Sequence, residues 1–127
     1  MKPDFVKNVS TWGNHPIVNK LFKAEEDYSK IREFVRQNNE VIAYGNGRCY
    51  GDAALAEAMF STKKLNKFIS FDRLNGIIEC ESGVLISEIL EVIIKQGYFL
   101  IITPGTKFIT LGGAIASNIH GKNHHLE

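Results

Sequence analysis

Apolar and polar positions along the chain follow the spacings of both strands and helices. Apolar residues three and four positions apart predict helices over residues 26–37 and from Leu85 to Ile94. Short alternating or continuous apolar runs predict strands at residues 17–23, 41–44, 58–61, 67–71, 76–81 and 99–102. This order of strands and helices predicts an α+β fold with at least one right-handed crossover connection.

Residues that favour helix ends bound the predicted helices. The acidic residues 25–27 suit a helix N-terminus, and Asn38-Asn39 is expected to end that helix, since asparagine tolerates the left-handed conformation. Gly97 is expected to cap the second helix, and Thr110 a short third helix over residues 111–117. Upstream of these elements, the residues up to Gly13 are predicted to form an irregular arm.

The composition is that of an ordinary globular protein. The chain has 127 residues, 44% of them hydrophobic and 23% charged, so it is one domain or part of one. A formal net charge of +1 gives no basic excess for nucleic acid. The longest apolar runs reach about five residues, against the roughly 20 that a membrane helix needs. Cys49 and Cys80 show no metal-like spacing, and with only two cysteines a reducing cytoplasm is the default expectation.

Two glycine-rich turns, residues 45–51 and 105–113, each follow a predicted strand. Glycine lets the backbone approach a ligand closely, and successive N–H groups can hold an anion. A helix beginning near Thr110 is expected to add its own exposed N–H groups. Together the turns suit a diphosphate, although glycine turns can also simply connect strands.

Two common nucleotide motifs do not fit the sequence. Gly45, Gly47 and Gly51 are one residue too widely spaced for the Rossmann fingerprint. The acidic residue that this fingerprint needs is also missing, because Glu57 comes too early and Asp72 lies in a poor context. The chain contains no nucleoside-triphosphate loop of the G-x-x-x-x-G-K-[ST] type either.

Three segments resemble a known family. Residues 44–52 resemble the first flavin-binding loop of the FAD-linked oxidases of the vanillyl-alcohol-oxidase class, and residues 103–116 resemble the second. Residues 118–125 contain the run H-G-K-N-H-H, which is similar to the decaprenylphosphoryl-β-D-ribose 2′-oxidase branch. The resemblance extends from about Thr11 to His125 and implies a PCMH-type FAD-binding domain: its first α/β subdomain and the start of the second.

The resemblance also implies that the chain is the N-terminal part of a longer enzyme. The remainder of the FAD domain and the substrate domain would then lie outside it. Leu126-Glu127 is read either as a cloning scar or as native sequence.

The same resemblance implies which residues hold FAD. The first loop is expected to hold the diphosphate through its backbone, the second to complete the site, and the residues after it to lie along the flavin. These residues are Ala43, Tyr44, Gly45, Asn46, Gly47, Arg48, Cys49, Tyr50, Gly51, Asp52 and Ala53, then Gly105, Thr106, Thr110, Leu111, Gly112 and Gly113, then Ser117, Asn118, Ile119 and His120.

Arg48 indicates how the flavin is held. Many aldonolactone and alditol oxidases have a histidine at this position, bonded covalently to the flavin, and a guanidinium cannot form that bond. The sequence therefore predicts non-covalent FAD. Cys49 stands where related loops often have a small hydroxyl residue, and it is not expected to capture the flavin.

Tyr50, His120 and Lys122 are the candidate catalytic residues. The resemblance implies that Tyr50 and Lys122 face the substrate pocket, where Lys122 would orient a phosphate or sugar hydroxyl or stabilise charge on reduced flavin. His120 would contact the flavin or relay a proton. The alternative for Lys122 is a solvated loop lysine. His120, His124 and His125 are not expected to bind metal, because Gly121 and Asn123 disfavour the necessary helix.

The implied reaction is oxidation of a secondary sugar hydroxyl to a ketone as half of an epimerisation. A partner reductase is the candidate for the other half. A sibling alternative is an aldonolactone or alditol oxidase, and a different one is a stand-alone binding or self-associating module. The substrate is expected to be a small molecule or lipid-linked sugar, so the cytoplasmic protein would meet the membrane only through its substrate. The 127 residues alone are expected to self-associate and to bind FAD weakly or not at all.

Overall fold

A computed structural model describes residues 5–121 of the chain. These residues divide into two compact units, Met1–Leu65 and Asn66–Glu127. No helix in the described range is both long and apolar enough to cross a membrane.

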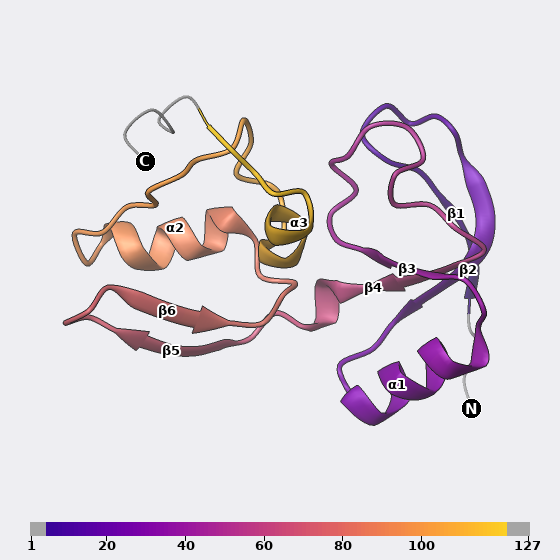
Figure 1. The fold of residues 1–127 in the computed structure, drawn as a ribbon, viewed down its shortest axis with the longest axis horizontal. Helices are drawn as coiled ribbons and strands as arrows, with labels where there is room; N and C mark the ends of the chain where they lie inside the picture. The colour runs from indigo at the N-terminus through magenta and orange to yellow at the C-terminus, as the bar shows by residue number, and fades with distance from the viewer. Residues whose placement is uncertain (1–4, 122–127) are drawn as a thin grey trace. The chain divides into compact units, whose positions relative to one another are not determined.

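A four-stranded sheet forms the first unit (Figure 1). The strands lie in the order β1 (Phe5–Val9), β2 (Val18–Ala24), β4 (Ala58–Ser61), β3 (Val41–Tyr44). Strands β2 and β3 both run parallel to β4, and helix α1 (Tyr28–Gln37) makes the crossover between them. These strands and this helix confirm the predictions for residues 17–23, 41–44, 58–61 and 26–37.

Strand β1 falls inside the predicted irregular arm, so that prediction was wrong. The strand pairs antiparallel with β2 from Phe5↔Phe22 to Val9↔Val18. Pairing with β2 makes residues 5–9 a strand, although their local sequence pattern does not indicate one.

Side chains of β4 are buried on both faces of this sheet. Phe34 of α1 is buried against Ala58 and Phe60 of β4, and its ring centroid lies 6.4 Å from that of Phe60. Because successive side chains of a strand alternate, Met59 of β4 points to the opposite face, where it is fully buried. A short 3-10 helix, Thr62–Lys64, follows β4.

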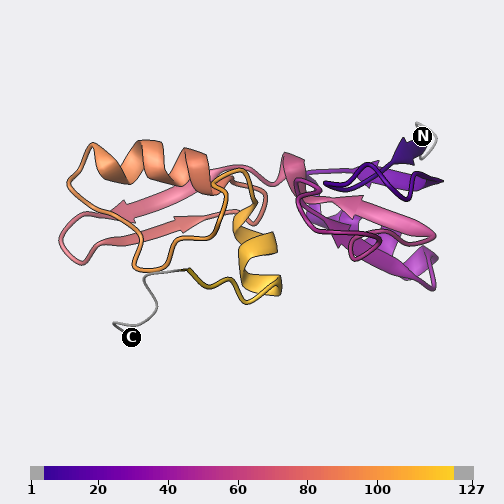
Figure 2. The ribbon, with the colours of Figure 1, turned by 90° about the horizontal axis from the view of Figure 1, so that it is seen from above.

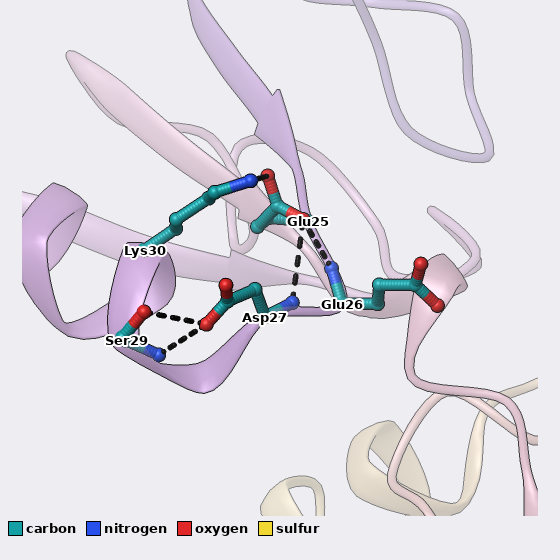
Figure 3. A network of polar contacts seen from close by, with 5 residues as sticks. All are labelled: Glu25, Glu26, Asp27, Ser29 and Lys30. Atoms are coloured by element: carbon teal, nitrogen blue, oxygen red, sulfur yellow. Dashed lines mark hydrogen bonds and ion pairs between the residues drawn. The ribbon is translucent and has the colours of Figure 1, made fainter.

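Two carboxylates order the start of α1 (Figure 3). Asp27 is the N-cap, and its Oδ1 accepts hydrogen bonds from the Ser29 N–H at 2.8 Å and the Ser29 hydroxyl at 2.6 Å. These bonds lower the pKa of Asp27. Glu25 accepts from the N–H groups of Glu26 and Asp27, which lowers the pKa of Glu25. The Nζ atom of Lys30 lies 3.9 Å from Oε2 of Glu25, the oxygen that does not accept these bonds.

The helix ends at the predicted place for a different reason. Asn38 is extended, with φ −121°, and is not left-handed. Its side-chain Nδ2 donates to the Phe34 carbonyl at 2.8 Å, which satisfies one carbonyl that the helix end leaves without a helical partner.

A hairpin and two helices form the second unit. Strands β5 (Phe68–Asp72) and β6 (Ile77–Cys80) pair antiparallel, and α2 (Ile86–Ile94) covers one face of the hairpin (Figures 1 and 2). The core of this unit comprises Val84, Ile86, Ile89, Ile93 and, from α3 (Leu111–Ala116), Ala114. Phe71, Ile78 and Cys80 of the hairpin pack against it.

Helix α2 ends at Ile94, and Gly97 terminates it as predicted. This glycine has φ +83°, and the next N–H, of Tyr98, donates to the Ile93 carbonyl at 3.0 Å. The strand predicted at residues 99–102 is wrong. Leu100 packs against the core, but no neighbouring strand pairs with this segment in the described chain, and a strand needs a partner for its backbone groups.

Candidate functional site

The first glycine-rich turn follows β3 and lies against the connection between β1 and β2 (Figure 1). The Trp12 N–H donates to the Cys49 carbonyl at 3.2 Å, and the Thr11 hydroxyl donates to the Gly51 carbonyl at 2.5 Å. At the end of β3, the Tyr44 hydroxyl donates to the Ser10 carbonyl at 2.6 Å. Three successive residues of the upstream segment therefore hold this turn.

Carbonyl groups of the turn accept two of these three hydrogen bonds, whereas none of the three is donated by a backbone N–H group of the turn. Across the described residues, no hydrogen bond is found from the N–H groups of residues 47–52. The turn is also accessible, since the Tyr50 side chain is 81% exposed and Arg48 is exposed too. Successive unbonded N–H groups in an exposed turn are an anion-binding arrangement.

Two glycines shape the turn for different reasons. Gly47 and Gly51 have φ +63° and +57°, which disfavours other residues at both positions. A Cβ on Gly47 would also lie 2.2 Å from the Tyr44 hydroxyl oxygen, a severe overlap. A Cβ on Gly51 would meet no atom within 4 Å. Gly47 is therefore needed for internal packing, whereas the space at Gly51 is open.

Trp12 and Arg48 form a pair beside the turn. The Arg48 guanidinium carbon lies 5.4 Å from the centroid of the Trp12 ring, which is 57% exposed. Trp12 is therefore not a core residue. It restrains the permanent cation of the turn.

Two side chains, Tyr44 in the first unit and Cys80 in the second, have raised pKa values. Burial, followed by the neighbouring Cys49, raises the pKa of Tyr44, which keeps its hydroxyl protonated as the donor to Ser10. Burial, followed by Glu88, raises the pKa of the Cys80 thiol, which makes Cys80 a poor nucleophile.

The second glycine-rich segment runs into α3, and the N–H groups of residues 111–113 are already bonded. Leu111 donates to the Val84 carbonyl at 2.8 Å and Gly112 to the Ser82 carbonyl at 2.8 Å. Gly113 donates to the Thr110 hydroxyl oxygen at 3.0 Å. The expectation that this helix exposes its N–H groups to a ligand is therefore wrong. The cap by Thr110 is confirmed.

Packing explains why residue 112 is a glycine, but it does not explain why residue 105 is one. A Cβ on Gly112 would lie 3.0 Å from the Ser82 Cβ and 3.1 Å from the Ser82 carbonyl oxygen. A Cβ on Gly105 would meet nothing within 4 Å, and Gly105 has no positive φ. The neighbouring Thr106 hydroxyl accepts from the Phe108 N–H at 3.2 Å.

The residues after α3 return toward the core of their own unit. The Ile119 N–H donates to the Ala114 carbonyl at 3.1 Å, and the Ile119 side chain packs against the core. Ser117, Asn118 and His120 are exposed, and Asn118 has φ +45°. Lys122, His124 and His125 lie outside the described residues. Within the described part of the chain, His, Cys, Asp and Glu form no group of three that could hold a metal ion.

The first turn fits the diphosphate of FAD. It combines unbonded N–H groups, a permanent cation at Arg48 and an open glycine at Gly51. Sequence reasoning found these residues but missed Ser10 and Thr11, which hold the turn. No local pattern in the sequence marks these two residues, because their contacts with the turn join distant parts of the chain.

A sequence model of the FAD binding domain matches residues 20–127. The chain belongs to the FAD-binding domain family. It is 32% identical to the decaprenylphosphoryl-beta-D-ribose oxidase of Mycolicibacterium smegmatis over 97% of this chain and 28% of that protein. It is 38% identical to the D-lactate dehydrogenase of Anaerostipes hadrus over 50% of this chain and 13% of that protein.

Solved structures agree on the fold. Cholesterol oxidase from Brevibacterium sterolicum, as a His121Ala mutant, gives a TM-score of 0.69 at 14% identity over 90% of this chain and 24% of that one. The fold is that of PCMH-type FAD-binding domains, as the sequence predicted, and FAD is the cofactor of the family. The chain spans less than a third of the length of the curated relatives described above.

Proposed function

We propose that this FAD-binding domain belongs to an oxidoreductase that oxidises a secondary hydroxyl of a lipid-linked ribose, as half of an epimerisation. The observation that carries the proposal is the 32% identity to decaprenylphosphoryl-beta-D-ribose oxidase over 97% of this chain, a range that includes both glycine-rich segments. The D-lactate dehydrogenase similarity supports a second candidate, oxidation of a 2-hydroxy acid.

In this proposal the first turn binds the cofactor. The N–H groups of residues 47–52 bind the diphosphate, and Arg48 supplies a positive charge restrained by Trp12. The chemistry that FAD supplies when bound is two-electron oxidation of a carbinol carbon.

The remaining proposed roles concern the substrate and the rest of the cofactor. Tyr50 is exposed and near the unbonded N–H groups, so it is available to contact the sugar. His120 is exposed and would accept or relay the hydroxyl proton, while Lys122 would orient a phosphate or hydroxyl. Ser117, Asn118 and the segment from Gly105 to Gly113 would contact the remainder of the cofactor.

We further propose that FAD is held without a covalent bond, because a guanidinium at position 48 cannot form the link that a histidine makes. The test is acid precipitation of the complete gene product. Flavin in the supernatant supports the proposal, and flavin in the pellet contradicts the non-covalent part. No flavin in either fraction, even after added FAD, would favour a binding module without catalysis.

Substrate oxidation is then measured as anaerobic loss of the flavin absorbance. We expect a polyprenylphosphoryl ribose to bleach the flavin, and D-lactate and an aldonolactone to leave it unchanged. Bleaching by D-lactate alone would favour the 2-hydroxy-acid candidate. Bleaching by the aldonolactone alone would favour the sibling class of sugar-lactone oxidases.

Self-association of the 127-residue chain is also part of the proposal. Large apolar side chains are exposed on the second unit, and such surfaces are usually covered by a partner. They include Ile69, Ile77, Phe99, Ile101 and Ile115. Light scattering should give a dimer or larger species, and a monomer at working concentration would contradict this. We place the protein in the cytoplasm, with membrane contact only through a lipid-linked substrate.

A further inference from the structure

The segment Ser10 to Trp12 has no role in the family match, which begins at residue 20. Apart from local bonds to Asn14, its hydrogen bonds nevertheless reach the first glycine-rich turn and the end of the strand before it. We propose that this segment, called the clamp below, is a positioning element that aims two backbone N–H groups of the turn at a nucleotide diphosphate. The inference rests on the proposed function of the turn.

Peptide geometry gives the direction of these N–H groups. In a trans peptide the C=O of one residue and the N–H of the next point in opposite directions. The only cis peptide in the described chain is His15-Pro16, so the peptides after Cys49 and Gly51 are trans. Since the clamp binds the Cys49 carbonyl, the Tyr50 N–H points away from the clamp.

The same argument applies one peptide further on. The clamp binds the Gly51 carbonyl through the Thr11 hydroxyl, so the Asp52 N–H also points away from the clamp. Neither N–H has a hydrogen-bond partner among the described residues. Two N–H groups held in one direction can bind one anionic group together.

Thr11 is the residue of the clamp that a side-chain substitution can test. It is only 5% exposed, and its hydroxyl is a buried donor to the Gly51 carbonyl. Trp12 adds a second link, since its ring lies against the Arg48 guanidinium. The clamp thus orients both the N–H groups and the cation that would meet a diphosphate.

The first measurement uses the unaltered chain, titrated with ADP and, as a ligand without phosphates, with adenosine. Amide NMR signals of Tyr50 and Asp52 should shift with ADP and not with adenosine. Hydrogen exchange at Trp12 should be slow without ligand, while exchange at Tyr50 and Asp52 should be fast and slow down when ADP is added. Protection at Tyr50 or Asp52 without ligand would overturn the inference.

The second measurement compares variants of Thr11. Thr11→Val keeps the shape but removes the donor, so ADP binding should weaken about fivefold to tenfold, as expected for one lost hydrogen bond. Thr11→Ser should restore binding. Ile31→Val, at a partly buried position of α1 in the same unit, is the control for general loosening and should leave ADP binding unchanged.

The outcomes separate the clamp from the proposed function. ADP shifts in the turn together with normal ADP binding by Thr11→Val would overturn the clamp and leave FAD binding by the turn intact. No shift in the turn with ADP or with FAD, in this chain and in the complete gene product alike, would overturn both. Equal losses in Thr11→Val and Ile31→Val would assign Thr11 a structural role only. If Thr11→Val does not fold, the exchange pattern of the unaltered chain still decides.

Discussion

The two glycine-rich segments look alike in sequence and differ in their hydrogen bonds. In residues 47–52 the N–H groups have no described partner, while carbonyls of the turn accept bonds from Thr11 and Trp12. In residues 111–113 the N–H groups donate to Val84, Ser82 and Thr110. The first segment can therefore offer N–H groups to an anion, and the start of α3 cannot.

The difference shows that glycine content alone does not identify a ligand site. Gly112 is close to Ser82, so it serves the packing of α3 against the segment before α2. Gly51 and Gly105 have open space where a side chain would lie. A ligand contact is best sought where a glycine lacks an internal packing reason and the nearby N–H groups lack partners.

The largest effect is expected for Gly47→Ala. Its Cβ would overlap the Tyr44 hydroxyl in a backbone with positive φ, so the free energy of unfolding should fall by about 3 kcal/mol. Urea denaturation measures this change. Gly51→Ala is the matched control, because it has similar φ but open space, and should cost only about 1 kcal/mol. Equal losses would mean that Tyr44 does not decide the need for Gly47.

Gly112→Ala should have the next largest effect, a loss of about 1–2 kcal/mol, because the new Cβ crowds Ser82. Ser82→Gly removes one of the crowded atoms. In that background the loss from Gly112→Ala should be smaller, as measured by a double-mutant cycle in urea. An unchanged loss would show that the Ser82 side chain does not set the packing of α3.

Acid should weaken the cap of α1 and spare the cap of α3. The pKa of Asp27 is lowered in the folded chain, so its contribution is full above the ordinary value of 3.8 and is lost as the pH falls through the lower folded pKa. The cap of α3 is the Thr110 hydroxyl, which does not titrate.

Amide NMR can follow the two caps separately. The Ser29 signal should move as the pH falls below 3.8, while the Gly113 signal stays in place. Asp27→Asn keeps an acceptor without a titrating carboxyl, and it should remove the Ser29 transition. A persisting transition would assign it to Glu25, whose pKa is also lowered.

The smallest change in stability is expected for Gly105→Ala. Since a Cβ there meets no atom within 4 Å and φ is not positive, the free energy of unfolding should change by less than about 1 kcal/mol. Binding of FAD to the complete gene product should nevertheless weaken if the cofactor approaches this backbone. Unchanged FAD affinity would remove Gly105 from the candidate site.

Most helices and strands could be predicted because their signals are local. The spacing of Phe34 with its neighbours, the run Ala58–Ser61 and the cap at Thr110 are all properties of a few adjacent residues. Strand β1 and the absent strand at residues 99–102 could not be predicted, since a strand depends on whether a partner lies beside it.

By itself, the sequence determined the α+β class, the cap at Thr110, the left-handed glycine after α2 and the family of the chain. Only the tertiary structure decided which N–H groups of those glycine segments remain without partners. The bond from Thr11 to Gly51 joins residues 40 positions apart, and the bonds to Ser82 and Val84 also cross long stretches of chain. Such bonds depend on which segments the fold brings together, so no local pattern can reveal them.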